Sequence, residues 1–357
     1  MKHNPALDGI RALAVLMVIG FHSFTPGASG GYLGVDVFFV LSGFLITSLL
    51  LDEVHRTGSI HLARFYFRRF MRLTPALLLM LCAYLILAPL AWPQMAFRTD
   101  VRDVLISTFY LSDYASAFWS LPLYLRHTWS LAVEQHFYLL WPLVVLVLAR
   151  RFRKSQLAIA LGMMYLAFSA WRIYCDLSGD TGYMHSYFRF DTRLSGLTVG
   201  SLLAVLLTNS RQRRSRHADL AALSGLAVIA LCTWRFQVLS TSAMVFGMAA
   251  VEMATLTLIY VAVTADGSFV QRALAHPVPS FIGKMSYGIY LWHYPIFIYL
   301  WGRCPWYVTL VGGGVASLTL AVVSYYSVER IARHYARNRK TEAPLRSAKV
   351  EPAAASE

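Results

Sequence analysis

The first apolar segment of the chain carries two ionisable side chains, Arg11 and His22, that could do chemistry inside a membrane. They are eleven residues apart, which on an α-helix places them within about 20° of one face and roughly 16 Å apart along the axis. Ionisable groups inside a membrane span cost about 2.5–3.5 kcal/mol, so they are candidates for function. An imidazole titrates near physiological pH, which makes His22 the best candidate for a general base. The structural alternative is that Arg11 reaches lipid headgroups and His22 makes a hydrogen bond at the membrane boundary.

Acidic side chains lie near the start of two other apolar segments. Asp36 begins the second segment at the level expected for His22, although it could simply be a favourable charge at a helix N-terminus. His127 and Glu134 are seven residues apart and therefore about 20° off one helical face. Glu134 could orient an imidazole or hold a substrate, whereas His127 could equally cap the helix.

Two later segments carry further polar side chains. Asp191 stands between two arginines, where it could face a substrate or form an ion pair that fixes the helix end. Ser286, Tyr290 and His293 follow one another at i, i+4 and i+7 and share one helical stripe. A histidine in mid-span is costly, so the stripe predicts a pore lining. Ser286 and Tyr290 could instead bond across helices.

Four arginines, at positions 64, 68, 69 and 72, precede the third apolar segment. Arg69 and Arg72 are spaced at i and i+3 and therefore share a face. Guanidinium groups bind phosphate well, so this pair could hold a phosphorylated donor. The ordinary excess of basic residues on the cytoplasmic side explains the same cluster equally well.

The amino-acid composition indicates which kind of structural element positions these residues. Of the 357 residues, 57% are apolar and only 14% are charged. Soluble domains carry about 25% charged residues, so the chain is expected to be a polytopic membrane protein. Nucleic-acid-binding, coiled-coil and disordered classes are excluded despite the formal charge of +14. The four cysteines show no metal-ligand spacing, and no metal is expected.

Eleven apolar segments approach the roughly 20 residues that a transmembrane helix needs. Basic residues accumulate in cytoplasmic loops, and the clusters at 56–72, 150–154, 211–216 and 330–349 share one side only if the polar segment 103–118 does not cross. We therefore expect an all-α bundle of about ten transmembrane helices with both termini cytoplasmic. One extra helix near 103–118 would lie in, or dip into, the outer interface. The ten expected spans are 6–24, 33–51, 73–92, 128–149, 157–174, 190–208, 218–235, 243–264, 281–301 and 306–328.

The chain is expected to form one integral membrane domain over residues 1–335, because no long polar insert separates the apolar segments. A disordered basic and polar cytoplasmic tail is expected over residues 336–357. Asp8 and Arg11 interrupt the N-terminal apolar run, which continues past any cleavage point, so an uncleaved first span is expected there.

Six motifs, in order over about residues 5–330, resemble those of a known family. They are DGIR at 8–11 followed by ten residues and His22, FFVLSGF at 38–44, RFMRLTP at 69–75, WSLAVE at 129–134 with Phe137-Tyr138, RFD at 189–191, and the stretch from Gly283 to Pro295. The chain thus resembles the membrane acyltransferase-3 family of bacterial cell-surface and polysaccharide O-acyltransferases, in its stand-alone form without a fused esterase domain. It departs from the family pattern at Gln135, where a second acidic residue is common, and at Ile331, where a proline is usual.

The resemblance implies transfer of an acyl group, usually acetyl, from cytoplasmic acyl-CoA to a hydroxyl of a cell-surface or lipid-linked glycan. The expected location is the bacterial inner membrane. Direct transfer and a covalent acyl-histidine both stay open. The implied catalytic residues are His22 and Glu134, the donor-binding residues are Arg11, Arg69 and Arg72, and the substrate or pore-lining residues are Asp36, Ser42, Trp129, Asp191, Ser286, Tyr290 and His293.

The expected partners are acyl-CoA, preferably acetyl-CoA, a glycan or lipid-linked sugar, and membrane lipids, but no nucleic acid. A transporter or exporter of a glycan or small molecule is the competing hypothesis. A polar-lined bundle with histidine and arginine near the midplane would also serve proton-coupled movement.

Overall fold

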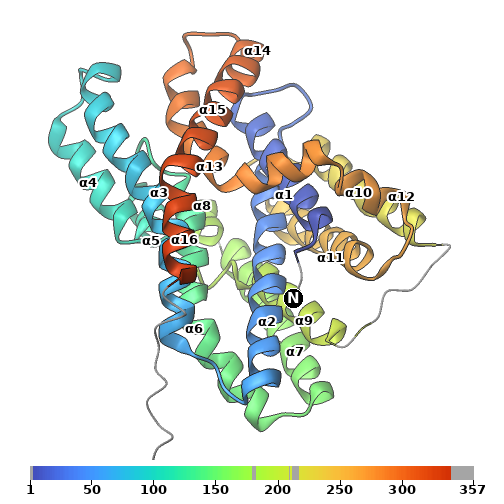
Figure 1. The fold of residues 1–357 in the computed structure, drawn as a ribbon. Coiled ribbons are helices and arrows are strands. Elements are labelled where there is room, and N and C mark those ends of the chain that lie inside the picture. Colours follow the sequence, from blue (N-terminus) through green and yellow to red (C-terminus); the bar gives the residue numbers. More distant parts are fainter. Residues whose placement is uncertain (1–2, 179–181, 209, 211–216, 339–357) are drawn as a thin grey trace, which may run out of the picture.

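The computed structural model describes residues 3–178, 182–208, 210 and 217–338, and this part of the chain consists of helices joined by loops (Figure 1). Three short π-helical segments extend the α-helices: Ala243–Gly247 leads into α11, Thr309–Gly313 joins α14 to α15, and Tyr325–Glu329 joins α15 to α16. The α-helices are α1 (Pro5–His22), α2 (Gly34–Thr57), α3 (Leu62–Ala91), α4 (Phe97–Thr108), α5 (Ser112–Trp119), α6 (Thr128–Arg151), α7 (Lys154–Leu177), α8 (Gly182–Phe188), α9 (Leu194–Leu207), α10 (Ala218–Arg235), α11 (Met248–Thr264), α12 (Phe269–Leu274), α13 (Pro277–Leu300), α14 (Trp306–Val308), α15 (Gly314–Ser324) and α16 (Arg330–Asn338).

Eight helical stretches in the described residues are long and apolar enough to cross a membrane. They are Pro5–His22, Gly31–Thr57, Leu62–Ala91, Thr128–Arg151, Lys154–Leu177, Ala218–Arg235, Ala243–Thr264 and Trp306–Ala336. The other two expected spans are also helical, since α9 has 14 residues and α13 has 24. The expected all-α polytopic bundle is confirmed. The number of ten crossings and the cytoplasmic side of both termini stay predictions.

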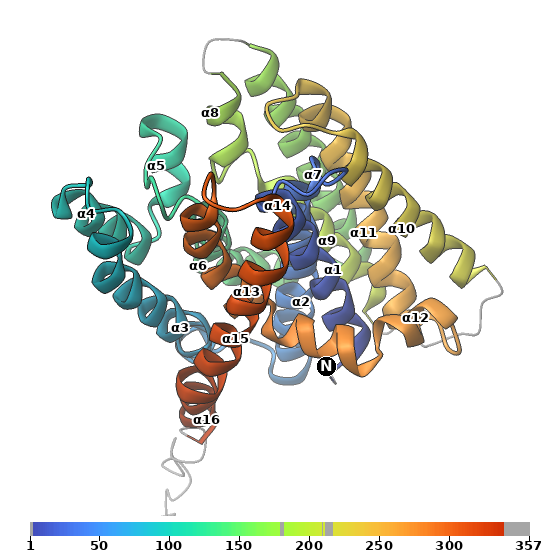
Figure 2. The ribbon, with the colours of Figure 1, turned by 90° about the horizontal axis from the view of Figure 1, so that it is seen from above.

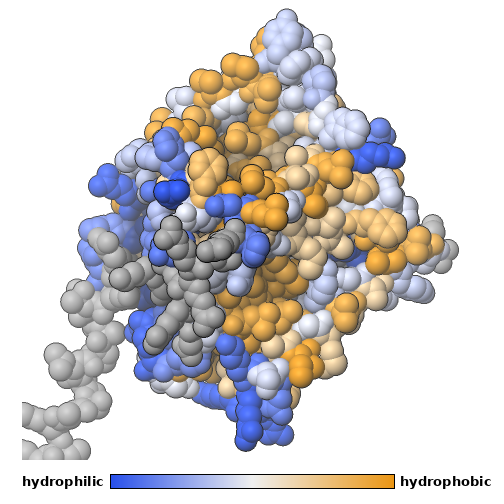
Figure 3. All heavy atoms as spheres, turned by 90° about the vertical axis from the view of Figure 1, so that its right-hand side faces the viewer, coloured by the Kyte–Doolittle hydropathy of each residue, from blue (hydrophilic) through white to orange (hydrophobic). Residues whose placement is uncertain are grey.

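The outer surface of the bundle is apolar, as a lipid-facing surface must be. Figure 3 shows apolar side chains over much of the face that carries α10, where Leu220, Leu223 and Leu231 are more than half exposed, at 65%, 51% and 57%. Such a surface in water would drive aggregation, whereas in a bilayer it contacts acyl chains.

The segment 103–118 differs from the expected single helix. Its residues belong to two helices, α4 and α5, because the chain turns at Tyr110, which has a left-handed φ of 55°. The polar residues of the segment are buried between these helices and the bundle, where Asp103 accepts a hydrogen bond of 2.6 Å from the Leu123 amide. Burial raises the pKa of the Asp103 carboxyl. Neither helix meets the length of a membrane span, in agreement with a segment that does not cross.

The C-terminal helix also differs from the expected boundary. Helix α16 continues to Asn338, so the chain is still helical where a disordered tail was expected to begin at residue 336. The rest of the expected tail, and the basic cluster at 211–216, lie outside the described residues.

Two close helix pairs form the centre of the bundle: α2 packs along α9, and α1 packs along α13. Seen from above in Figure 2, these helices lie between α3–α6 on one side and α10–α12 on the other. A Cβ atom at Gly43 would lie 1.9 Å from the Leu197 carbonyl oxygen, and one at Gly283 would lie 1.8 Å from the Asp8 carbonyl oxygen. Only glycine allows the backbones to come this close. The α1–α13 contact aligns the polar residues of these two helices.

Candidate active site

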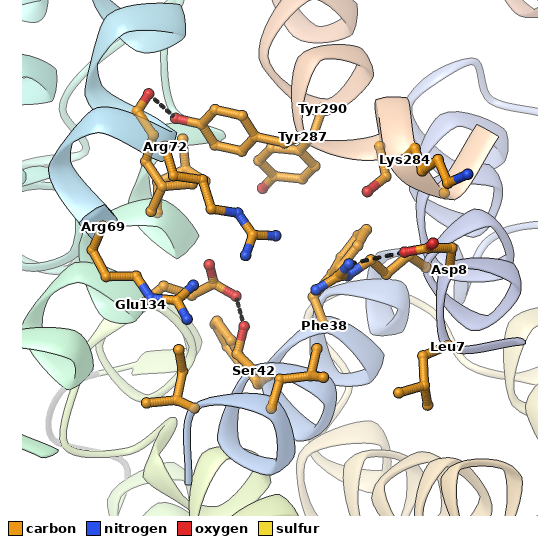
Figure 4. Close-up of a pocket in the computed structure, with 18 of the residues that line it drawn as sticks. Leu7, Asp8, Phe38, Ser42, Arg69, Arg72, Glu134, Lys284, Tyr287 and Tyr290 are labelled. Carbon is orange, nitrogen blue, oxygen red and sulfur yellow. Dashed lines mark hydrogen bonds and ion pairs between the residues drawn. The ribbon is translucent and has the colours of Figure 1, made fainter. Parts of the chain in front are cut away.

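A pocket of about 540 Å³ opens at the end of the bundle where α1 begins. Its walls come from α1, α2, α3, α6, α13 and the C-terminal helix, with side chains directed into the space between them (Figure 4). Seven of the residues singled out in the sequence line it: Arg11, Ser42, Arg69, Arg72, Glu134, Ser286 and Tyr290. Residues from five helices that are far apart in the sequence therefore converge on one cavity.

The pocket carries an excess of positive charge. Its basic side chains, apart from His3, are Arg11, Arg69, Arg72, Lys284 and Arg333, and its carboxylates are Asp8 and Glu134. Within the described residues, neither Arg69 nor Arg72 forms a salt bridge. The Arg69 guanidinium instead lies over the rings of Phe65 and Tyr138, at 5.6 and 5.5 Å from their centroids. Guanidinium groups without a salt bridge in a partly open pocket favour an anionic ligand.

Arg11 is held by an acidic neighbour one turn earlier on α1. Its Nη1 lies 3.1 Å from Asp8 Oδ1, and the other Asp8 oxygen lies 2.7 Å from Nε2 of His3. Asp8 is 4% exposed, whereas the side chain of His3 is 60% exposed. The pair fixes Arg11 in the wall of the pocket, between the open end and its interior.

Glu134 belongs to the basic pocket. Its carboxylate accepts hydrogen bonds from Ser42 Oγ at 2.6 Å and from the Tyr138 hydroxyl at 2.9 Å. His127, one residue before α6, packs on the ring of Tyr294 with 4.8 Å between centroids. Glu134 thus contacts Ser42 and Tyr138, whereas the imidazole of His127 contacts Tyr294. Glu134 therefore does not orient the imidazole of His127.

His22 and His293 meet at the other end of α1. His22 Nδ1 lies 3.0 Å from the Val18 carbonyl oxygen, and His293 Nδ1 lies 2.6 Å from the Tyr290 carbonyl oxygen. A carbonyl oxygen only accepts, so each Nδ1 carries the proton. His293 Nε2 then accepts from His22 Nδ1 at 3.3 Å. This leaves the Nε2 lone pair of His22 unprotonated, and no hydrogen bond from the described residues occupies it.

Tyr290 separates the pocket from the two histidines. Its ring lines the pocket, its hydroxyl donates to the His127 carbonyl at 2.9 Å, and its own carbonyl holds His293. The hydroxyl also lies 2.7 Å from Ser130 Oγ. Neither His22 nor His293 lines the pocket. Tyr290, whose ring lies 5.3 Å from that of His293, is therefore one side chain between a ligand in the pocket and the two histidines.

Three of the expected substrate-lining residues, Asp36, Trp129 and Asp191, lie outside the pocket. Asp36 is buried and pairs with Arg193 at 2.9 Å, and the ring of Trp129 lies 5.4 Å from the same guanidinium. Asp191 pairs with Arg189 and accepts from Trp171 Nε1 at 2.7 Å. Arg193 at the start of α9 pairs with Asp36 of α2, whereas Arg189 and Asp191 pair within the loop between α8 and α9. A contact of Asp36, Trp129 or Asp191 with a substrate stays a prediction.

Within the described residues, no group of three or more histidine, cysteine, aspartate or glutamate side chains could hold a metal ion.

A family model described as an acyltransferase domain matches residues 4–326 of the chain. The chain belongs to the membrane acyltransferase-3 family.

Members of this acyltransferase family are similar to the chain over most of its length. O-acetyltransferase OatA of Staphylococcus aureus is 36% identical over 351 residues, which cover 92% of this chain. A putative O-acetyltransferase of the same species is 32% identical over 360 residues, again covering 92% of this chain. The chain spans 57% of the length of both relatives. No solved structure matches it.

Some charged residues of this acyltransferase-family chain were not singled out in the sequence. Arg172 of α7 is buried, and its Nη1 contacts Glu252 of α11 at 3.2 Å and Ser195 at 2.6 Å. Arg172 and Glu252 both lie within apolar segments, so the cost of charge in a span was a signal for them. Lys284 lines the pocket and lies between the Gly283 and Ser286 of a recognised motif, but nothing in its type or spacing marked it.

Proposed function

We propose that the protein is a membrane-embedded O-acyltransferase that moves an acyl group, acetyl in the first instance, from acyl-CoA to a hydroxyl of a cell-surface or lipid-linked glycan. One observation carries this proposal: a basic pocket with unpaired guanidinium groups and an imidazole with a free lone pair occupy opposite ends of α1. The first suits a phosphorylated donor and the second suits a hydroxyl acceptor.

The donor binds in the pocket. The phosphates of acyl-CoA pair with Arg69 and Arg72, whose guanidinium groups form no salt bridge in the part of the chain that the structure describes, and Lys284 adds a further positive charge. Arg11, held by Asp8, offers hydrogen bonds to the amide carbonyls of the pantetheine arm farther in. The arm then extends towards Tyr290, and movement of that side chain brings the thioester to His22.

Transfer at His22 follows general-base chemistry. Nε2 takes the proton of the acceptor hydroxyl as the oxygen attacks the thioester carbonyl carbon; the C–S bond breaks, and the CoA thiolate leaves and recovers that proton. His293 stabilises the protonated His22 because its Nε2 accepts from His22 Nδ1. A covalent route would place the acyl group on Nε2 of His22 first, and labelled acyl retained by denatured protein in the absence of acceptor would identify it.

The pocket opens where α1 begins and extends to Tyr290 beside His293, and His22 ends the same helix. We propose that the donor enters from one membrane face and the acceptor from the other. Placing the pocket in the cytoplasm, where acyl-CoA is made, puts His22 at the outer face of a bacterial inner membrane. The same placement puts the N-terminus in the cytoplasm, as the distribution of basic residues predicts.

The test is transfer of radiolabelled acetyl from acetyl-CoA to sugar acceptors by the purified protein. We expect His22→Ala to lower transfer by at least about a hundredfold, the contribution of a general base. His55→Ala, which alters an exposed histidine at the end of α2, should retain wild-type transfer. Wild-type turnover in His22→Ala would contradict the assigned base. Movement of a glycan or protons without any labelling would favour a transporter.

A further inference from the structure

The aromatic side chain of Trp301 borders His22, and that of Phe24 borders Trp301. The indole of Trp301 lies nearly parallel to the His22 ring, at an interplanar angle of 18° and 6.5 Å between centroids, and its Nε1 donates to the His22 carbonyl at 2.7 Å. The ring of Phe24 lies 5.1 Å from that of Trp301. Phe24, Trp301 and the imidazole thus follow one another as three neighbouring rings, nearly parallel between His22 and Trp301 and tilted by 54° between Trp301 and Phe24; we call them the aromatic platform.

Phe24 is both strained and exposed. Its φ is 57°, in the left-handed region that a bulky residue rarely adopts, and its side chain is 66% exposed. A residue held in such a conformation, without the benefit of burial, points to a functional role for the side chain. The strain comes from the Cβ atom of Phe24. A glycine at this position would adopt the same backbone conformation without the steric conflict.

The loop that carries Phe24 is fixed to the rest of the bundle. The Gly30 amide donates to the Thr233 carbonyl at 2.8 Å, and the Ser29 hydroxyl donates to the Phe236 carbonyl at 2.9 Å. At Phe24 itself, its amide donates to the Phe21 carbonyl at 3.0 Å and the Thr25 amide donates to the Gly20 carbonyl at 3.1 Å. These hydrogen bonds on both sides of the residue hold its backbone in the left-handed conformation.

We infer that the aromatic platform binds a hexopyranose ring of the acceptor and presents one of its hydroxyls to Nε2 of His22. This inference rests on the proposed function. A pyranose has a face of polarised C–H bonds, which complements the negative face of an aromatic ring, and its hydroxyls project from the rim. A sugar ring that stacks on Phe24 and contacts the tilted ring of Trp301 keeps its rim free to meet His22.

The experiment measures the acceptor KM, the donor KM and thermal stability for wild-type protein and Phe24→Gly. Acetyl-CoA is the donor, and methyl hexopyranosides with di- and trisaccharides at millimolar concentration are the acceptors. We expect Phe24→Gly to raise the acceptor KM roughly tenfold, the loss of one aromatic contact, with the donor KM unchanged. Its melting temperature should equal or exceed that of the wild type, because glycine relieves the strain.

Phe109→Gly is the matched control, since Phe109 is 67% exposed but lies at the end of α4. It should leave the acceptor KM unchanged. Trp301→Ala is the second platform variant and should raise the acceptor KM and also lower kcat, because it removes the bond to the His22 carbonyl. An unchanged acceptor KM in Phe24→Gly, or an equal rise in Phe109→Gly, would overturn the platform alone. No transfer to any sugar by the wild type would overturn the proposed function and the platform together.

Discussion

Arg69 and Arg72 are the residues on which donor binding depends in this account. Both line the pocket and form no salt bridge among the described residues, so a phosphorylated donor gains charge-assisted hydrogen bonds from them. We expect Arg69→Ala combined with Arg72→Ala to raise the KM for acetyl-CoA at least tenfold. A rise of this size corresponds to the free energy lost with one or two such hydrogen bonds. Arg64→Ala is the control, because Arg64 is exposed on the same helix outside the pocket. An equal rise in the control would show that general positive charge, and not the pocket, attracts the donor.

His293 is a positioning residue that acts through His22. It is fully buried, and its Nε2 accepts a second hydrogen bond from the His22 Nδ1–H that the Val18 carbonyl already holds, which orients the ring with Nε2 free. We expect His293→Ala to lower kcat about tenfold, the worth of one hydrogen bond, with the donor KM unchanged. His293→Gln supplies another acceptor and should restore part of the loss. If Gln were no better than Ala, the role of His293 would be packing only.

The sequence predicted the pocket better than it predicted the ion pairs around it. Arg11, Glu134 and Ser286 were singled out by their cost in a span or by a family motif, and all three line the cavity. The partner of Asp36 was not predictable, because Arg193 is 157 residues away in the sequence. Only the packing of α2 against α9 brings the two side chains together.

At the scale of helices, the α2–α9 contact depends on glycine. A methyl group at Gly43 would meet the Leu197 carbonyl oxygen at 1.9 Å, so Gly43→Ala must push the two helices apart. We expect a loss of about 1–3 kcal/mol in unfolding free energy, measured by thermal unfolding in detergent. Gly162→Ala on α7 is the control: a Cβ there meets nothing within 4 Å, and alanine favours helix. Equal stability of the two variants would contradict the close contact.

The buried Arg193–Asp36 pair joins α9's start to α2. Arg193→Ala leaves a carboxylate that is 2% exposed without its cation, so we expect a loss of about 3–5 kcal/mol. The double variant Asp36→Asn with Arg193→Met removes both charges and should recover most of that stability. The same unfolding measurement checks both variants. A double variant as unstable as Arg193→Ala would mean that the loss comes from packing around Trp129 and not from the unpaired charge.

The length of the apolar segments predicted where the helices lie, but it did not predict where each helix ends or is interrupted. All ten expected spans contain helix, because about 20 apolar residues in lipid must satisfy their backbone hydrogen bonds internally. The division of 103–118 into α4 and α5 depends on the left-handed turn at Tyr110. Tyrosine rarely adopts this conformation, so the sequence did not predict a turn there. The continuation of α16 to Asn338 was likewise hidden by its charged composition.

At the scale of the whole molecule, the account requires that the donor and the acceptor approach from opposite ends. The pocket opens where α1 begins, and His22 ends the same helix. A helix of 18 residues is about 27 Å long, close to the thickness of the hydrocarbon core. The bundle would therefore carry an acyl group across most of the membrane while CoA stays on the side where it bound.

Reconstituted vesicles test this claim most directly. Radiolabelled acetyl-CoA, which does not cross the bilayer, is added outside vesicles that hold the purified protein and a trapped oligosaccharide. We predict that label appears on the trapped sugar with the wild type and that His22→Ala abolishes this labelling. Label only on sugar placed on the same side as acetyl-CoA, or equal labelling of trapped sugar by His22→Ala, would contradict the account.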